Sequence, residues 1–352
     1  MIPWLVFLGA GTNAAADGTT NDDPFAEIRE EREARSADEE ATPALAAEPV
    51  ADDPGLGLEL IGRLGASDRN AEPVLSGGLG LDLFRRVVTD SGTWGSFEAQ
   101  VRLVWDKLQS PNFEVHNLFL EKRFLFGRLN LVLGHFQVPF NLEALPIDTH
   151  TTLIQLGNRR ALGLKHDWGA GLRGQLAAID YDLAYSLGSG MRFDLDTRGM
   201  ATGRLGWTSA ADTLGLGLSA IGGERQVATT LREAGEPVTG WRVGADLFYR
   251  ILFMRLLAEA SAGQDRGRRV LGLLVRLEGE SYDDLWHAAM QYGVNESPAV
   301  HGPDPTHRVE LEAALRLLLL SHGSFLRINV ATHDQGGPWS LVGTAMLYLR
   351  FD

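Results

Sequence analysis

The sequence predicts an all-β protein, a transmembrane antiparallel β-barrel of sixteen strands. Beyond Pro54, segments of about ten residues alternate between apolar and polar side chains, and Gly, Asp and Ser separate them, which is typical of strands in a membrane barrel. No run of about eighteen apolar residues occurs, so no helix is long enough to span a bilayer. The segments number sixteen, and an even number returns both ends of the sheet to the same side of the membrane.

The expected strands follow one another with breaks of unequal length. They cover residues 56–66, 76–88, 94–107, 113–125, 128–138, 160–174, 179–188, 199–208, 213–223, 240–250, 254–264, 267–278, 284–295, 307–319, 324–333 and 338–351. Tight turns at 126–128 and 321–323 follow even-numbered strands, whereas the longer connections 67–75, 139–159, 189–198, 224–239 and 296–306 follow odd-numbered ones. Because such barrels have short periplasmic turns and longer external loops, the N- and C-termini are expected in the periplasm.

Residues 97–106 show the alternation most clearly. Phe97, Val101 and Trp105 fall on one face of the expected strand, and Glu98 and Arg102 fall on the other. A soluble β-sandwich would alternate in the same way. Two features favour the membrane: Trp and Tyr recur at the ends of the apolar face, as interfacial girdles do, and the second face carries charges that a dry core would not tolerate.

The chain before the barrel has a different composition. Residues 1–16 combine an apolar segment with the pattern Ala14-Ala15-Ala16 and are expected to be a signal peptide. Residues 17–54 are acidic and rich in Ala, Pro and Thr, which predicts a mostly disordered periplasmic segment, with the barrel in 55–352. Residues 1–54 hold 13 acids and 3 arginines, whereas the remainder is nearly balanced. This distribution argues against nucleic-acid binding, which requires a basic face.

Three segments carry a resemblance to a known family. The stretches 131–143 (LVLGHFQVPFNLE), 158–163 (NRRALG) and 179–190 (IDYDLAYSLGSG) resemble successive motifs of the phosphate-selective porins O and P. The resemblance implies a sixteen-stranded, often trimeric porin whose third extracellular loop, here 139–158, folds into the lumen. Phosphate-selective members use lysines at the constriction, and this loop contains none, so phosphate selectivity is not carried over.

Charged residues at alternating positions are expected to line the lumen. At the constriction, loop residues are expected to face wall residues: Glu143, Asp148 and His150 opposite Arg102, Arg123, Arg159 and Arg160. Elsewhere the expected lining residues are Glu98, Lys165, Asp167, Arg242, Asp246, Arg316 and Arg327. Opposed charges would act on permeating ions and polar solutes. Alternatively, many of these side chains pair across neighbouring strands and stiffen the wall.

Signals for chemistry are absent from the sequence. The chain has no cysteine, and its nine histidines show no metal-ligand spacing, so neither a metal, a cofactor nor an enzyme activity is expected. The leading function is a porin-like channel for passive diffusion of small hydrophilic solutes or ions in the bacterial outer membrane. The alternative is a structural barrel, a sheath or anchor in a larger assembly whose lumen holds a partner. A transporter specific for one organic solute is a third possibility. The expected partners are outer-membrane lipid and lipopolysaccharide, with assembly as a homotrimer or in a larger envelope complex.

Overall fold

The computed structural model describes residues 55–68, 70–89, 92–106, 111–144, 165–196, 198–211, 213–226, 236–281, 285–296, 306–316, 324–334 and 339–351. The signal peptide and acidic segment predicted for residues 1–54 lie outside them. The strands are β1 (Gly55–Ser67), β2 (Asn70–Thr89), β3 (Gly92–Asp106), β4 (Asn112–Phe124), β5 (Leu129–Gln137), β6 (His166–Leu176), β7 (Ile179–Ser186), β8 (Met200–Thr208), β9 (Leu214–Gln226), β10 (Pro237–Ile251), β11 (Met254–Asp265), β12 (Arg268–Glu280), β13 (Trp286–Glu296), β14 (Thr306–Arg316), β15 (Phe325–Asp334) and β16 (Ser340–Phe351). Two 3-10 helices, η1 (Leu125–Gly127) and η2 (Asn141–Ala144), follow β4 and β5.

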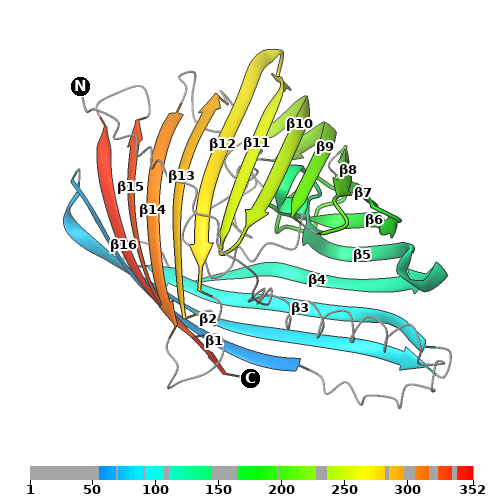
Figure 1. Ribbon diagram of the computed structural model, residues 1–352, viewed down its shortest axis with the longest axis horizontal. Helices are drawn as coiled ribbons and strands as arrows, with labels where there is room; N and C mark the ends of the chain where they lie inside the picture. Colours follow the sequence, from blue (N-terminus) through cyan, green and yellow to red (C-terminus); the bar gives the residue numbers. More distant parts are fainter. Residues whose placement is uncertain are drawn as a thin grey trace, which may run out of the picture. The chain divides into compact units, whose positions relative to one another are not determined.

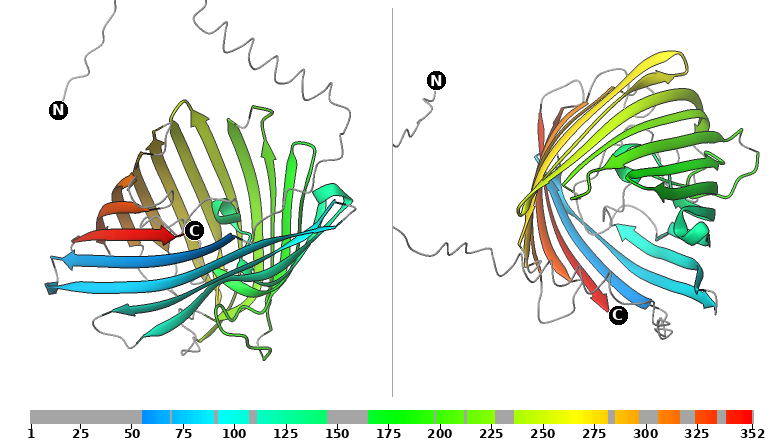
Figure 2. Two further views of the ribbon diagram at one scale, coloured as in Figure 1. Left: turned by 90° about the horizontal axis from the view of Figure 1, so that it is seen from below. Right: turned by 45° about the vertical axis from the view of Figure 1, so that its right-hand side comes forward.

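All sixteen strands join in one closed sheet (Figure 1). Each strand pairs antiparallel with its neighbours in sequence, and β1 closes the ring on β16. The closing register sets Leu58 opposite Phe351, so the first and last strands bring the two chain ends of the sheet to the same end of the barrel. Figure 2 shows the strands arranged in a ring. The predicted fold class, a closed antiparallel barrel of sixteen strands, is confirmed.

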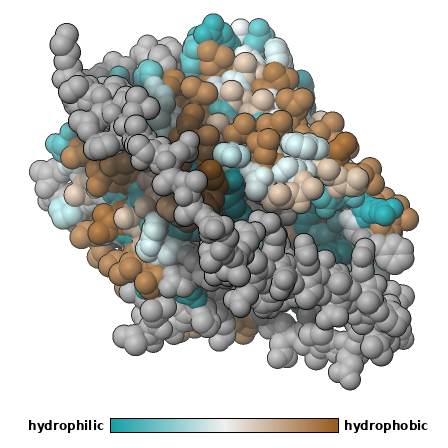
Figure 3. All heavy atoms as spheres, in the orientation of Figure 1, coloured by the Kyte–Doolittle hydropathy of each residue, from teal (hydrophilic) through white to brown (hydrophobic). Residues whose placement is uncertain are grey.

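The two faces of the sheet differ as the alternation predicts. Outward leucines such as Leu205 and Leu218 are more than half exposed, and apolar side chains are prominent on the face seen in Figure 3. Inward positions carry buried charged groups; Glu59, for example, is buried between the exposed Leu58 and Leu60. An apolar outer belt and a polar interior are the arrangement of a barrel that faces lipid outside and water or polar groups inside.

Aromatic side chains form two rows on the outer face. Trp105, Trp241 and Tyr292 lie towards the end of the barrel where odd-numbered strands finish. Towards the other end, Trp207, Tyr249 and Trp286 are similarly exposed. Between the two rows the outward residues are mostly apolar. Rows of this kind mark the two membrane–water interfaces in transmembrane barrels.

Most connections after even-numbered strands are short, as expected, although residues 317–324 separate β14 from β15. Residues 177–178 alone join β6 to β7, and residues 252–253 alone join β10 to β11. The connection predicted at 67–75 is wrong, because β2 already begins at Asn70 and only residues 68–69 separate it from β1. The expected loop contains Pro73, which lacks a backbone N–H donor. The register shifts between Gly65 and Ser67, opposite Pro73, and such a bulge is where a sheet tolerates proline.

No helix in the described part of the chain is long and apolar enough to cross a membrane.

Candidate functional site: the barrel interior

The chain that leaves β5 turns into the barrel and reaches the inner face of β8 to β11. Val138 and Phe140 pack against Met200 of β8 and Ile221 of β9, and all four side chains are buried. The short helix η2 that follows contacts β9, β10 and β11, which lie several strands away from β5 around the ring (Figure 2). The segment Val138–Leu142 therefore lies inside the ring of strands, where it occupies part of the interior cross-section.

Apolar side chains hold this segment to the wall. Leu142 is fully buried against Leu257 of β11 and Leu274 of β12, and Phe248 of β10 packs beside them. These three wall residues point inward. The register sets Leu257 opposite both Phe248 and the inward Arg276, and Leu274 lies two residues before Arg276 on β12. We call Phe248, Leu257 and Leu274 the apolar seat. The seat could not be predicted from the sequence, because alternation assigns a side chain to a face without revealing which segment of the chain packs against it.

A hydrogen bond to β9 and a close approach to β10 position the same segment. The backbone N–H of Asn141 donates to the hydroxyl oxygen of Ser219 at 2.9 Å. Opposite this point is Gly244, where a Cβ atom would overlap the side-chain amide of Asn141. A glycine is needed there because the incoming chain approaches the wall so closely.

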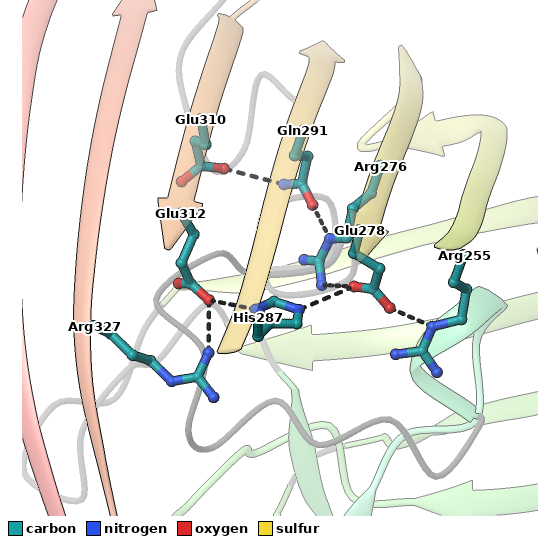
Figure 4. Close-up of polar contacts among 8 residues, drawn as sticks. All are labelled: Arg255, Arg276, Glu278, His287, Gln291, Glu310, Glu312 and Arg327. Atoms are coloured by element: carbon teal, nitrogen blue, oxygen red, sulfur yellow. Dashed lines mark hydrogen bonds and ion pairs between the residues drawn. The ribbon is translucent and has the colours of Figure 1, made fainter. Parts of the chain in front are cut away.

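A continuous polar network links side chains of β11 to β15 on the inner face (Figure 4). Glu278 of β12 accepts a hydrogen bond from Arg255 of β11 and lies 3.7 Å from Arg276. His287 of β13 stands between Glu278, at 3.9 Å, and Glu312 of β14, at 3.7 Å. Each of these carboxylates thus faces several donors from neighbouring strands.

The network continues along β13 and ends on β15. The guanidinium of Arg276 donates to the Gln291 side-chain oxygen at 2.8 Å, and the Gln291 amide donates to Glu310 at 3.0 Å. Arg327 donates to Glu312 at 2.8 Å. Acids and bases meet both within β12 and between neighbouring strands, so the buried charges are paired rather than left isolated, which a low-dielectric wall requires.

Further buried ion pairs stiffen the rest of the wall. Arg204 makes a two-pronged contact with Asp246, at 2.7 and 3.0 Å, and also reaches Asp180 at 2.6 Å. Arg242, together with Arg225, pairs with Asp265, at 2.5 and 2.8 Å respectively. Several residues expected at the lumen therefore point inward but serve as partners in the wall.

The two wall arginines expected at the constriction lie apart. Arg102 is buried near the odd-strand end of β3, where it pairs with Glu59 at 2.6 Å, and Glu59 also accepts a hydrogen bond from Tyr348. Arg123 is next to last in β4, at the opposite end of the barrel. Its side chain is 39% exposed and lies 3.6 Å from Glu121, which also pairs with Arg173. The structure thus does not bring Arg102 and Arg123 together.

Asp167, at the start of β6, is buried and forms hydrogen bonds with a neighbouring connection. Its carboxylate is fully buried and accepts hydrogen bonds from the backbone N–H groups of Gly188, Ser189 and Gly190, at 2.5, 3.1 and 3.0 Å. Gly188 and Gly190 have φ values of 74° and 65°, which favour glycine and let successive N–H groups converge. The Gly-Ser-Gly motif noted in the sequence thus binds a carboxylate of the wall.

The remaining predicted residues are placed as follows. Glu98 points inward and accepts a hydrogen bond from Asn117 at 2.6 Å. Lys165 directly precedes β6, Arg316 ends β14, and Glu143 lies in η2. Asp148, His150, Arg159 and Arg160 lie outside the described residues, as does most of the predicted inward loop. Among the described residues, no group of three or more His, Asp or Glu side chains is arranged to hold a metal ion.

The comparisons with known proteins agree on the fold. OprB of Pseudomonas putida, in its high-pH structure, is similar with a TM-score of 0.61 at 9% identity over 85% of this chain and 94% of that one. An anion-selective porin from Comamonas acidovorans gives 0.60 at 11% identity over 85% and 100%, and the trimer form of OmpT, an outer membrane protein of Vibrio cholerae, gives 0.56 at 13% over 85% and 99%. The chain has the porin fold. No family model and no curated protein matches the sequence.

Proposed function

We propose that this chain is a porin-like outer-membrane channel through which small hydrophilic solutes or ions diffuse passively, and that it is not an enzyme. One observation carries the proposal. The segment Val138–Leu142 lies inside a barrel with a polar inner wall, and it packs on the apolar seat. A chain segment that lies in the lumen narrows the channel without blocking it. The apolar outer belt between two aromatic rows supports a location in the membrane.

The short connections after even-numbered strands are proposed to face the periplasm, which places both termini of the barrel there. The outer belt is proposed to contact phospholipid and lipopolysaccharide. A homotrimer is proposed because a protein with this fold, the Vibrio cholerae OmpT, is described in a trimer form. Phosphate selectivity has no support in the described wall, where the arginines named above face acids at short range.

Purified full-length protein in planar bilayers and in solute-loaded liposomes tests this proposal. A channel gives stepwise conductance and admits small sugars faster than large ones. Protein that inserts and is silent in both assays contradicts the channel. Silence favours the structural alternative, a barrel whose lumen is occupied, for which the many buried wall charges are the supporting observation.

A further inference from the structure

Two cations on the lipid-facing side of β2 to β4 have no acidic partner in the described strands. Lys122 points outward, since its neighbours Glu121 and Arg123 point inward, and it is level with Gly95 of β3 and Leu131 of β5. Arg85 of β2 also points outward, opposite Phe97 of β3. This contrasts with the inner wall, where arginines pair with carboxylates on adjacent strands.

Aromatic rings hold the Lys122 ammonium group at a defined place. Its Nζ atom lies 5.1 Å from the centre of the Trp94 ring and 5.0 Å from that of Phe124. Both contacts are within the range of cation–π attraction, which orients an ammonium group without neutralising its charge. The positive charge therefore remains available to a ligand that approaches from the membrane.

The two cations are close enough to share one small anion. Arg85 and Lys122 are separated by one intervening strand, β3, and by two residues along the strand direction. At about 4.8 Å between strands and about 3.3 Å per residue, their backbones are roughly 12 Å apart. Extended Arg and Lys side chains each cover about half of that distance, and the exposed Arg85 is free to turn towards Lys122.

Their height on the barrel selects the ligand. Arg85 follows the apolar outward residues Leu79, Leu81 and Leu83, and Lys122 lies two residues before the end of β4. Both are thus at the level of lipid headgroups, near the end of the barrel where even-numbered strands finish. In the proposed orientation this is the periplasmic leaflet, which consists of glycerophospholipid.

We infer that Arg85, Lys122 and Trp94 form a binding site for the phosphate of a glycerophospholipid headgroup on the outer surface of β2 to β4. This inference uses the orientation given under Proposed function, but its test does not depend on channel activity. Arginine and lysine bind phosphate through charge-assisted hydrogen bonds, and the apolar outward residues of β2 and β3 would contact the acyl chains.

Native mass spectrometry of the full-length protein in detergent, titrated with phosphatidylglycerol, tests the site. Lys122→Gln and Arg85→Gln should each weaken binding roughly tenfold, which is the size expected for one charged hydrogen bond. Lys122→Arg should keep most of the affinity, because it retains the charge. The matched control is Arg269→Gln, which removes an outward arginine that is 70% exposed at the opposite end and lies near Glu296.

The outcomes separate the possible ligands. An equal loss with Arg269→Gln means that general surface charge binds the lipid and overturns the site. Titration with inorganic phosphate and with lipid A identifies the ligand. Tight binding of inorganic phosphate alone overturns the assignment to glycerophospholipid. The assignment is also overturned if Lys122→Gln and Arg85→Gln lose as much lipid A binding as phosphatidylglycerol binding. Heat-modifiability on gels confirms that each variant is folded. Unchanged phosphatidylglycerol binding in the folded Lys122→Gln and Arg85→Gln variants overturns the proposed site.

Discussion

The inner face of this barrel is built in two different ways. Across β11 to β15 it carries a network of paired charges, such as Glu312 with Arg327. On β10 to β12, the apolar seat of Phe248, Leu257 and Leu274 receives Leu142 from the inward segment. The charged region keeps the wall polar and rigid, whereas the seat fixes what crosses the lumen. Without the apolar seat, Leu142 would have no apolar surface of β10 to β12 against which to pack.

The largest effect is expected from breaking a buried ion pair. Arg204→Met leaves the carboxylate of Asp246 fully buried without its two-pronged partner, and should lower the free energy of unfolding by about 3–5 kcal/mol. Urea unfolding in lipid vesicles, followed by tryptophan fluorescence, measures the loss. Arg269→Met, at a 70% exposed side chain, should change stability by less than about 1 kcal/mol. Similar losses in both variants would show that the inner charges do not form a cooperative wall.

Removing apolar contact at the seat should cost nearly as much. Leu257 is fully buried, so Leu257→Ala should lower the free energy of unfolding by about 2–5 kcal/mol through lost contacts and a cavity. The control Leu205→Ala alters a side chain that is 58% exposed on the outer face and should cost less. The same urea experiment compares the two. A cost at Leu205 equal to that at Leu257 would contradict the seat.

A smaller effect is expected where Asp167 holds the Gly-Ser-Gly segment. Asp167→Asn removes the charge that three backbone N–H groups share, and should cost about 1.5–3 kcal/mol. Residues 187–196 should then become more sensitive to protease in intact vesicles. Asp196→Asn, at an exposed position of the same segment, provides the control. Unchanged protease resistance in Asp167→Asn would mean that other contacts hold the segment.

The smallest effect concerns ion selectivity and separates two arginines. Arg123 is 39% exposed, so Arg123→Gln should shift the reversal potential in a salt gradient towards cation preference. Arg102 is buried against Glu59, so Arg102→Gln should shift it less while destabilising the barrel more. Planar-bilayer recordings in a salt gradient measure both. A larger shift with Arg102→Gln would place that residue, and not Arg123, at the surface of the pore.

The sequence was sufficient for the fold because the period of two is a local property. Phe97 and Glu98 occupy opposite faces whatever their neighbours are, and the strand count follows from such segments. Partners could not be predicted in the same way. Whether Arg102 meets Glu59 or a permeating ion depends on the register between strands, which no single segment encodes.

The seat was hidden for a related reason. Alternation places Phe248 on the inward face with Arg242 and Asp246, but it does not reveal that Phe248 packs against Leu142. The capping of Asp167 by residues 188–190 likewise depends on a contact between distant parts of the chain. The resemblance found at 179–190 located that segment without revealing its role.

Single-channel conductance of the wild-type protein and of Leu142→Asn tests the central claim most directly. Leu142→Asn places a polar group against the apolar seat and should release the segment from the wall, so that conductance rises while the barrel remains folded. Leu218→Asn, at a side chain that is 68% exposed on the outer face, should leave conductance unchanged. A silent wild-type protein, or equal conductance in the wild-type protein and a folded Leu142→Asn variant, would contradict a lumen narrowed by the segment Val138–Leu142.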